Sequence, residues 1–146
     1  MSATVVALHL TPQSRAPLTP RTEVHALEQQ GLEGDRHARP GSRRQVLFVE
    51  IETLEALGLA PGAIREQVTV RGIQLDQLAV GTRVRIGSAE LEVAGPCRPC
   101  ERMEEIRSGL RAQLEGRRGR FLSVVRAGSF SVGQPLVIET GVAPGA

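Results

Sequence analysis

The apolar residues of this chain occur in short alternating runs, and glycine and proline separate these runs. The clearest case surrounds Gly87-Ser88, where Val84 and Ile86 alternate with polar residues before the pair, and Leu91 and Val93 do so after it. A period of two is typical of strands that bury one face, and a Gly-Ser pair between two such runs predicts a hairpin. Many short strands with few helices favour a small barrel over a sheet of repeated βαβ units.

The same criteria place the other elements. Ile51, Leu54 and Leu57 fall on one face of an expected helix over 50–57, which Gly58 ends. Apolar residues recur at helical spacing over 103–114 with Gly109 between them, so we expect one kinked helix or two short ones. Strands are expected at 4–10, 23–27, 45–49, 67–72, 80–87, 89–93, 119–125 and 132–138. The sequence thus predicts a mainly β fold with a few short helices (α+β), in one domain over 1–139 with a frayed tail at 140–146.

Composition argues against several classes of function. Eighteen arginines stand against 16 acidic residues, with no lysine, and give a formal net charge of +2. Three phenylalanines are the only aromatic residues, so we expect no base-stacking surface and no nucleic-acid partner. No apolar run approaches the roughly 18 residues of a membrane span, and the first ten residues lack a signal-peptide pattern. We therefore expect a cytoplasmic protein that does not associate with membranes.

Both cysteines of the chain lie in one turn, Pro96-Cys97-Arg98-Pro99-Cys100. Two close thiols in a chain without a secretory signal are more often catalytic or metal-binding than structural. Arg98 and Arg102 favour the thiolate form of Cys100, and nearby glutamates oppose it. The alternatives are inert thiols that cap a hairpin, a thioredoxin-type motif and a zinc site. A hairpin before the turn is the wrong context for thioredoxin, and no histidine stands at a zinc-ligand spacing.

A loop dense in charge, residues 31–41, precedes the buried strand at 45–49. Its basic side chains and those just after it could cradle a phosphate or another anion, and the alternative is a solvated loop whose arginines pair with acids. The residues concerned are Arg36, His37, Arg39, Arg43 and Arg44. Arg117, Arg118 and Arg120 form a smaller group of the same kind, for which we expect the solvated state.

Taken in order, these segments resemble the MOSC domain, the module at the C-terminus of molybdenum cofactor sulfurases. The resemblance spans about residues 3–139 and implies a small MOSC-type β-barrel, in agreement with the strand pattern. The ranges that carry it are 34–37, 44–47, 65–73, 80–87, 95–100, 119–121 and 132–133.

The resemblance also implies a molybdenum cofactor (molybdopterin), with Cys100 as its metal ligand and catalytic residue. Arginines would hold the phosphate of the pterin, and other polar side chains would hydrogen-bond its ring. The residues so implied are Arg36, Arg43 and Arg65 for the anion, and His37, Gln45 and Gln67 for the ring. Arg98 is a further cofactor-binding candidate. Members of the family include small bacterial proteins linked to reduction of N-hydroxylated bases, so the resemblance implies that reaction for this chain. Because the chain has no flavin, iron–sulfur or haem motif, electrons would come from an external donor.

Two other functions stay open. Cys100 could carry a persulfide received from a cysteine desulfurase, for the assembly of metal–sulfur cofactors, and Cys97 could release the sulfur by forming a disulfide. The chain would then be a sulfur transferase rather than a molybdenum-dependent oxidoreductase. Alternatively, the chain is a non-catalytic redox or binding module that uses a reversible Cys97–Cys100 bond.

Overall fold

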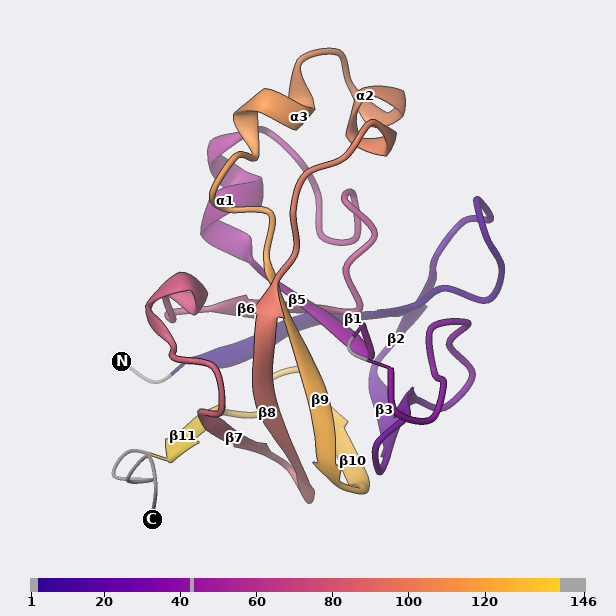
Figure 1. Ribbon diagram of the computed structural model, residues 1–146, viewed down its shortest axis with the longest axis vertical. Coiled ribbons are helices and arrows are strands. Elements are labelled where there is room, and N and C mark those ends of the chain that lie inside the picture. Colours follow the sequence, from indigo (N-terminus) through magenta and orange to yellow (C-terminus); the bar gives the residue numbers. More distant parts are fainter. Residues whose placement is uncertain (1–2, 43, 140–146) are drawn as a thin grey trace.

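The computed structural model describes residues 3–42 and 44–139, which form a curled sheet with short helices gathered at one end (Figure 1). The tail expected at 140–146 lies outside the described residues. The strands are β1 (Thr4–Leu10), β2 (Thr19–Arg21), β3 (Glu23–Leu27), β4 (Gly31–Leu32), β5 (Val46–Glu50), β6 (Val68–Arg71), β7 (Arg83–Ile86), β8 (Ala89–Pro96), β9 (Arg120–Arg126), β10 (Gly128–Ser131) and β11 (Val137–Glu139). The helices are α1 (Ile51–Ala56), the 3₁₀ turn η1 (Leu75–Gln77), α2 (Arg102–Ile106) and α3 (Leu110–Gln113).

Within the described residues, eight strands form one sheet in the order β11-β7-β8-β9-β5-β6-β1-β2, and β10-β3-β4 form a second sheet. The larger sheet curls into a half-barrel. Its strand pairs are antiparallel except β5 and β6, which run parallel and are joined through α1. The predicted mainly β fold with few short helices is therefore confirmed, and it contains one βαβ unit that the strand pattern did not indicate.

Strand β5 lies at the centre of the sheet and is buried on both faces. Val46 and Phe48 pack into the cluster inside the half-barrel, together with residues of β1, β6, β8 and β9. Leu47 and Val49 point to the opposite face and join a second cluster. This double burial explains why residues 46–49 form an unbroken apolar run rather than an alternating one.

The second cluster lies between the sheet and the helices. Leu54 of α1, Met103 of α2 and Leu110 of α3 pack there against β5. Of the two alternatives expected for 103–114, one kinked helix or two short ones, the structure has two short helices, since Gly109, with φ of +84°, separates α2 from α3. None of the helices in the described part of the chain has the length and hydrophobicity that a membrane crossing requires.

The predicted strands agree with the structure only in part. The hairpin at Gly87-Ser88 is confirmed by the pairing of Ile86 with Ala89. The single strand expected at 132–138 is instead a turn over 132–136 that leads into β11. Strand β2 was not expected because Pro17 and Pro20 break the apolar pattern, but it pairs with the end of β1 at the edge of the sheet, where proline is tolerated.

Candidate functional site

The cysteine turn is held at the end of β8 by its pairing with β9. A register shift between Val93 and Gly95 bends β8, and the backbone N–H of Cys97 donates to the carbonyl of Gly119 at 2.9 Å. Cys97 is half-buried and packs against the second cluster, whereas Cys100 is exposed. Both thiols are free. The turn therefore presents one thiol to solvent and holds the other against the core.

Gly119 allows this close pairing. Its φ is +122°, and a Cβ atom there would lie 2.5 Å from the carbonyl oxygen of Phe48. Such a distance is far below van der Waals contact, and the backbone conformation favours glycine. No other residue could bring residues 118–120 so close to β5.

A second loop is organised around the buried carboxylate of Asp35. One oxygen, Oδ1, accepts from the backbone N–H of Thr11 at 2.6 Å. The other, Oδ2, accepts from the backbone N–H and ring Nδ1 of His37, both at 3.0 Å, and from Nε2 of Gln67 at 3.1 Å. Burial works to raise the pKa of Asp35, but these hydrogen bonds outweigh it and hold the pKa below its ordinary value. Asp35 is thus a charged anchor for three segments.

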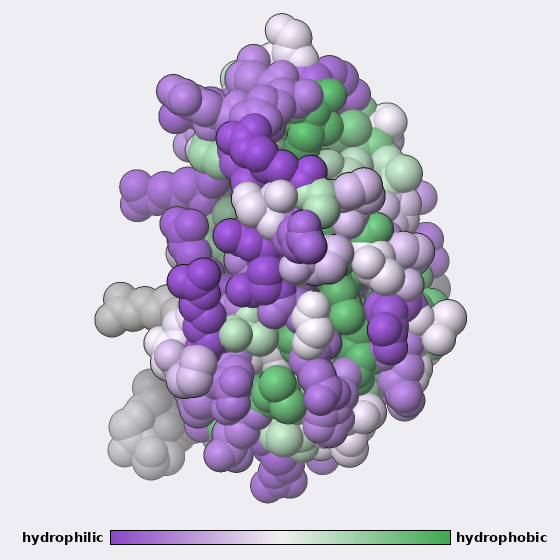
Figure 2. Space-filling model, turned by 90° about the vertical axis from the view of Figure 1, so that its right-hand side faces the viewer, coloured by the Kyte–Doolittle hydropathy of each residue, from purple (hydrophilic) through white to green (hydrophobic). Residues whose placement is uncertain are grey.

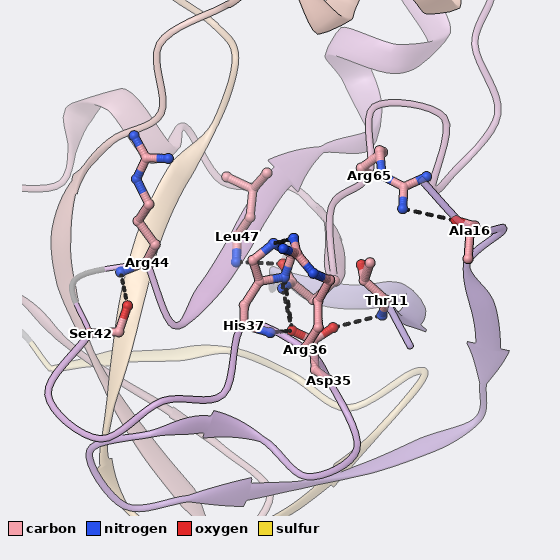
Figure 3. Close-up of polar contacts among 10 residues, drawn as sticks. Thr11, Ala16, Asp35, Arg36, His37, Ser42, Arg44, Leu47 and Arg65 are labelled. Atoms are coloured by element: carbon pink, nitrogen blue, oxygen red, sulfur yellow. Dashed lines mark hydrogen bonds and ion pairs between the residues drawn. The ribbon is translucent and has the colours of Figure 1, made fainter. Parts of the chain in front are cut away.

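Asp35 also determines which ring nitrogen of His37 carries the proton. Because a carboxylate only accepts, Nδ1 of His37 carries the proton and Nε2 is free to accept. Nη1 of Arg36 lies 3.2 Å from that Nε2. Figure 3 shows His37 and Arg36 together above Asp35, with Arg65 and Arg44 at opposite sides of the group.

These two loops line one cavity of about 620 Å³. Its lining includes seven of the residues predicted from the sequence, which are Arg36, His37, Arg44, Arg65, Gln67, Arg98 and Cys100. Arg15, Arg102 and Arg118 line it too, whereas Arg39 of the charged loop does not. We call it the arginine-lined cavity. It brings residues 36–37, 65–67 and 98–100 to one place although they are far apart in the chain. Hydrophilic residues spread over much of the face in Figure 2, with hydrophobic residues confined to strips between them.

Most of these arginines lack an acidic partner. Within the described residues, only Arg15 of the cavity forms an ion pair, with Glu105 at 2.9 Å. Arg65 donates to the carbonyl of Ala16 at 2.9 Å, and its pKa is lowered by burial, by Arg102 and by Arg36. The guanidinium of Arg44 lies 5.8 Å from the ring centre of Phe121. Clustered, unpaired cations on a concave surface attract an anion.

One nominated residue does not take the expected place, and one is not tested. Gln45 is buried and is absent from the cavity lining, because its Oε1 accepts from the N–H of Val124 at 2.9 Å and its Nε2 donates to the carbonyl of Ser42. Its role is to tie loop 42–45 to β9. Arg43 lies outside the described residues.

Gln67 lines the cavity, but its amide is already engaged. Its Oε1 accepts from the N–H of Leu47 at 2.8 Å while its Nε2 donates to Asp35. The amide keeps one N–H for a ligand.

Some residues of the cavity were missed or misjudged from the sequence. The solvated state expected for Arg118 is wrong, since its exposed fraction is only 7% and it lines the cavity. Arg117 is exposed, as expected. Asp35 was seen only as part of a charged loop. In the sequence, only its position directly after Gly34 and two residues before His37 indicates that it could anchor the loop.

The donor atoms in the cavity limit what it could hold. Within residues 3–42 and 44–139, no three His, Cys, Asp or Glu side chains come together as a metal-ligand group. Cys100 could supply one soft thiolate ligand, so a metal there would have to arrive with ligands of its own. The unpaired arginines fit an anionic carrier for such a metal.

Comparison with known proteins gives the family. The family model of the MOSC domain matches residues 7–137. The chain belongs to the MOSC domain family. No curated protein matches it.

Several solved structures share this MOSC fold. The YuaD protein from Bacillus subtilis is 21% identical with a TM-score of 0.79, and the match covers 93% of this chain and 94% of that one. YiiM from Geobacillus stearothermophilus is 22% identical with a TM-score of 0.77, over 97% and 77% of the two chains. YiiM from Escherichia coli is 21% identical with a TM-score of 0.74, over 97% and 72%. At this identity, the likeness is one of fold.

Proposed function

We propose that the arginine-lined cavity binds a molybdenum cofactor and that the thiolate of Cys100 is the protein's ligand to the metal. The observation that supports this most is that an exposed thiol shares one cavity with six arginines that form no ion pair within the described residues. MOSC domains are associated with this cofactor. Its pterin carries a phosphate, for which Arg36, Arg65 and Arg98 offer charge-assisted hydrogen bonds.

The reaction that we propose is reduction of an N-hydroxylated compound. The hydroxylamine R–NH–OH takes up two electrons and two protons, its N–O bond breaks, and R–NH₂ and water form. The bound cofactor supplies the two-electron chemistry, and an external donor in the cytoplasm supplies the electrons.

The chain's own residues would bind and orient the reactants. Arg36 and Arg65 would hold the phosphate. Gln67 has one N–H left for the ring, and Asp35 orients the ring of His37 so that its Nε2 accepts from Arg36 and holds that guanidinium beside the cavity. Cys97 would stay a thiol, since burial raises its pKa although Arg118 and Arg44 oppose that effect.

Pterin binding tests the role of the arginines. We would produce the protein in a host that makes the cofactor, and measure bound pterin in the wild type and in the double variant Arg36→Gln/Arg65→Gln. The expected result is a large loss of pterin in the double variant and no loss in Arg85→Gln, whose arginine pairs with Glu139 on β11. Equal pterin in all three proteins would contradict the proposal.

A second function is favoured by one feature, the presence of both free thiols on the lining of one cavity. Cys100 could accept sulfur from a cysteine desulfurase as a persulfide, and Cys97 could release it. Mass spectrometry after incubation with a desulfurase and cysteine would then show a gain of one sulfur atom on Cys100. Absence of that gain would remove this candidate.

A further inference from the structure

A second cavity lies on the other side of the cysteine turn. Its volume is about 580 Å³, and Pro96, Cys97, Arg98 and Pro99 line both cavities, as does Arg118. The turn is therefore a shared wall. The remaining lining of the second cavity comes from the end of β5, from Thr53 of α1, from residues 74–76 at η1 and from residues 115–120.

One wall of the second cavity carries unsatisfied positive charge. Arg118 is 7% exposed, and neither its Nε nor its Nη1 has a hydrogen-bond partner. Nε of Arg120 is also buried without a partner, although its Nη2 donates to the carbonyl of Leu78 at 3.1 Å. Within the described residues neither arginine forms an ion pair. A buried guanidinium with free donors is costly unless an anion satisfies it.

The facing wall carries carboxylates without cationic partners. Oε2 of Glu50 accepts from the N–H of Leu75 at 3.1 Å. Asp76 follows in η1 and also lines the cavity. Burial raises the pKa of Glu50, against the hydrogen bond from Leu75 and with help from Asp76 and Glu52. In the described part of the chain, neither Glu50 nor Asp76 reaches an arginine of the opposite wall within ion-pair distance.

We propose that the second cavity binds a small dipolar molecule, with its acidic group against Arg118 and Arg120 and its protonated amine or amidine against Glu50 and Asp76. A simple anion would meet the two carboxylates, and a simple cation would meet the guanidinium groups. Only a ligand with both charges compensates both walls. The site is behind Cys97, so its occupation does not require a cofactor in the arginine-lined cavity.

NMR titration of the cofactor-free protein tests this proposal. The probes are glycine, γ-aminobutyrate and 6-aminohexanoate, which separate their two charges by increasing lengths, with butyrate and butylammonium as single-charge controls. We expect saturable shifts of backbone amides at residues 74–76 and 115–120 with at least one amino acid. We expect butyrate and butylammonium to bind at least about tenfold more weakly, since each lacks one charge-assisted contact.

Three variants separate the site from general effects. Arg118→Met should abolish the saturable shifts, and Arg126→Met, at an exposed arginine that lines neither cavity, should retain them. Glu50→Gln keeps an oxygen for Leu75 but removes the charge, so it should also weaken binding of the amino acid at least about tenfold while butyrate binds no worse. If Arg118→Met does not fold, Glu50→Gln decides. Absence of saturable shifts with all three amino acids, or equal binding of butyrate, would overturn the proposal, whatever the pterin measurements give.

Discussion

Asp35 is the residue on which the geometry of the arginine-lined cavity depends most. We predict that Asp35→Asn lowers the free energy of unfolding by about 1–3 kcal/mol, because the amide replaces an acceptor that serves four donors. Urea denaturation at neutral pH measures this. Asp76→Asn is the matched control, since Asp76 is exposed, and should change stability by less than about 0.5 kcal/mol.

The same carboxylate gives a pH dependence. The pKa of Asp35 is lower in the folded protein than in the unfolded chain, so its stabilising effect is complete above the ordinary carboxyl pKa. That effect is lost as the pH falls through the lower, folded pKa. The difference in stability between wild type and Asp35→Asn should therefore shrink in acid. A constant difference down to the lowest pH at which the protein folds would contradict this.

The two cysteines should react differently. Cys100 is exposed, whereas Cys97 is half-buried and burial raises its pKa. Iodoacetamide at neutral pH should therefore alkylate Cys100 well before Cys97, because the thiolate is the nucleophile. Peptide mass spectrometry over a time course measures both. Faster modification of Cys97 would show that the turn is not held as described.

The sequence predicted the location of some site residues and not of others. Arg36, His37 and Cys100 could be nominated from local charge and from the resemblance, since each belongs to a motif. Arg117 and Arg118 are adjacent residues of the same type, so the sequence does not distinguish them. The pairing of β9 after Gly119 leaves Arg117 exposed and buries Arg118. Gln45 resembles a polar ligand in sequence, but its amide is used by Val124 and Ser42.

At the scale of elements, Gly119 sets the approach of β9 to β5. We predict that Gly119→Ala destabilises the protein by about 1–3 kcal/mol or more, because a Cβ would overlap the carbonyl oxygen of Phe48. Gly116→Ala is the control: φ is +79° there, but nothing lies within 4 Å of the added Cβ. Thermal unfolding should show a larger loss at 119 than at 116. Equal losses would assign the effect to backbone strain alone.

Element boundaries followed the sequence where periodicity was strong. Strand β1 matches its expected range, and the hairpin between β7 and β8 is where Gly87-Ser88 placed it. Strands β2, β4 and β10 were missed because short edge strands are stabilised by pairing with other strands and carry little periodicity of their own. Because β10 was not predicted, the turn at Val132-Gly133 that follows it was not predicted either.

At the scale of the whole molecule, the half-barrel collects basic side chains from distant segments into one cavity. Pyrophosphate at ten times its dissociation constant should stabilise the folded state by about 1.4 kcal/mol. For a chain of this size, that free energy corresponds to a rise in Tm of roughly 3–6 °C. The double variant Arg36→Gln/Arg65→Gln should lose most of that rise. Differential scanning fluorimetry against Arg85→Gln as control measures it. An undiminished rise in the double variant would place the anion elsewhere.

From the sequence, only the resemblance to the MOSC domain predicted that the loops lining the arginine-lined cavity lie close together. Local patterns give the elements, but the order of strands in the sheet decides that loops 35–37, 65–67 and 97–102 meet. The parallel pairing of β5 and β6 through α1 is the step that brings Gln67 to Asp35. No periodicity in either strand indicates that pairing.

Molybdenum content tests the central claim most directly. We would produce wild type, Cys100→Ala and Cys97→Ala in a host that makes the cofactor, and measure molybdenum per chain by elemental analysis. If Cys100 is the metal ligand, the metal should fall close to background in Cys100→Ala and stay near the wild-type level in Cys97→Ala. Full retention of molybdenum in Cys100→Ala, or no molybdenum in any of the three proteins, would contradict the assignment.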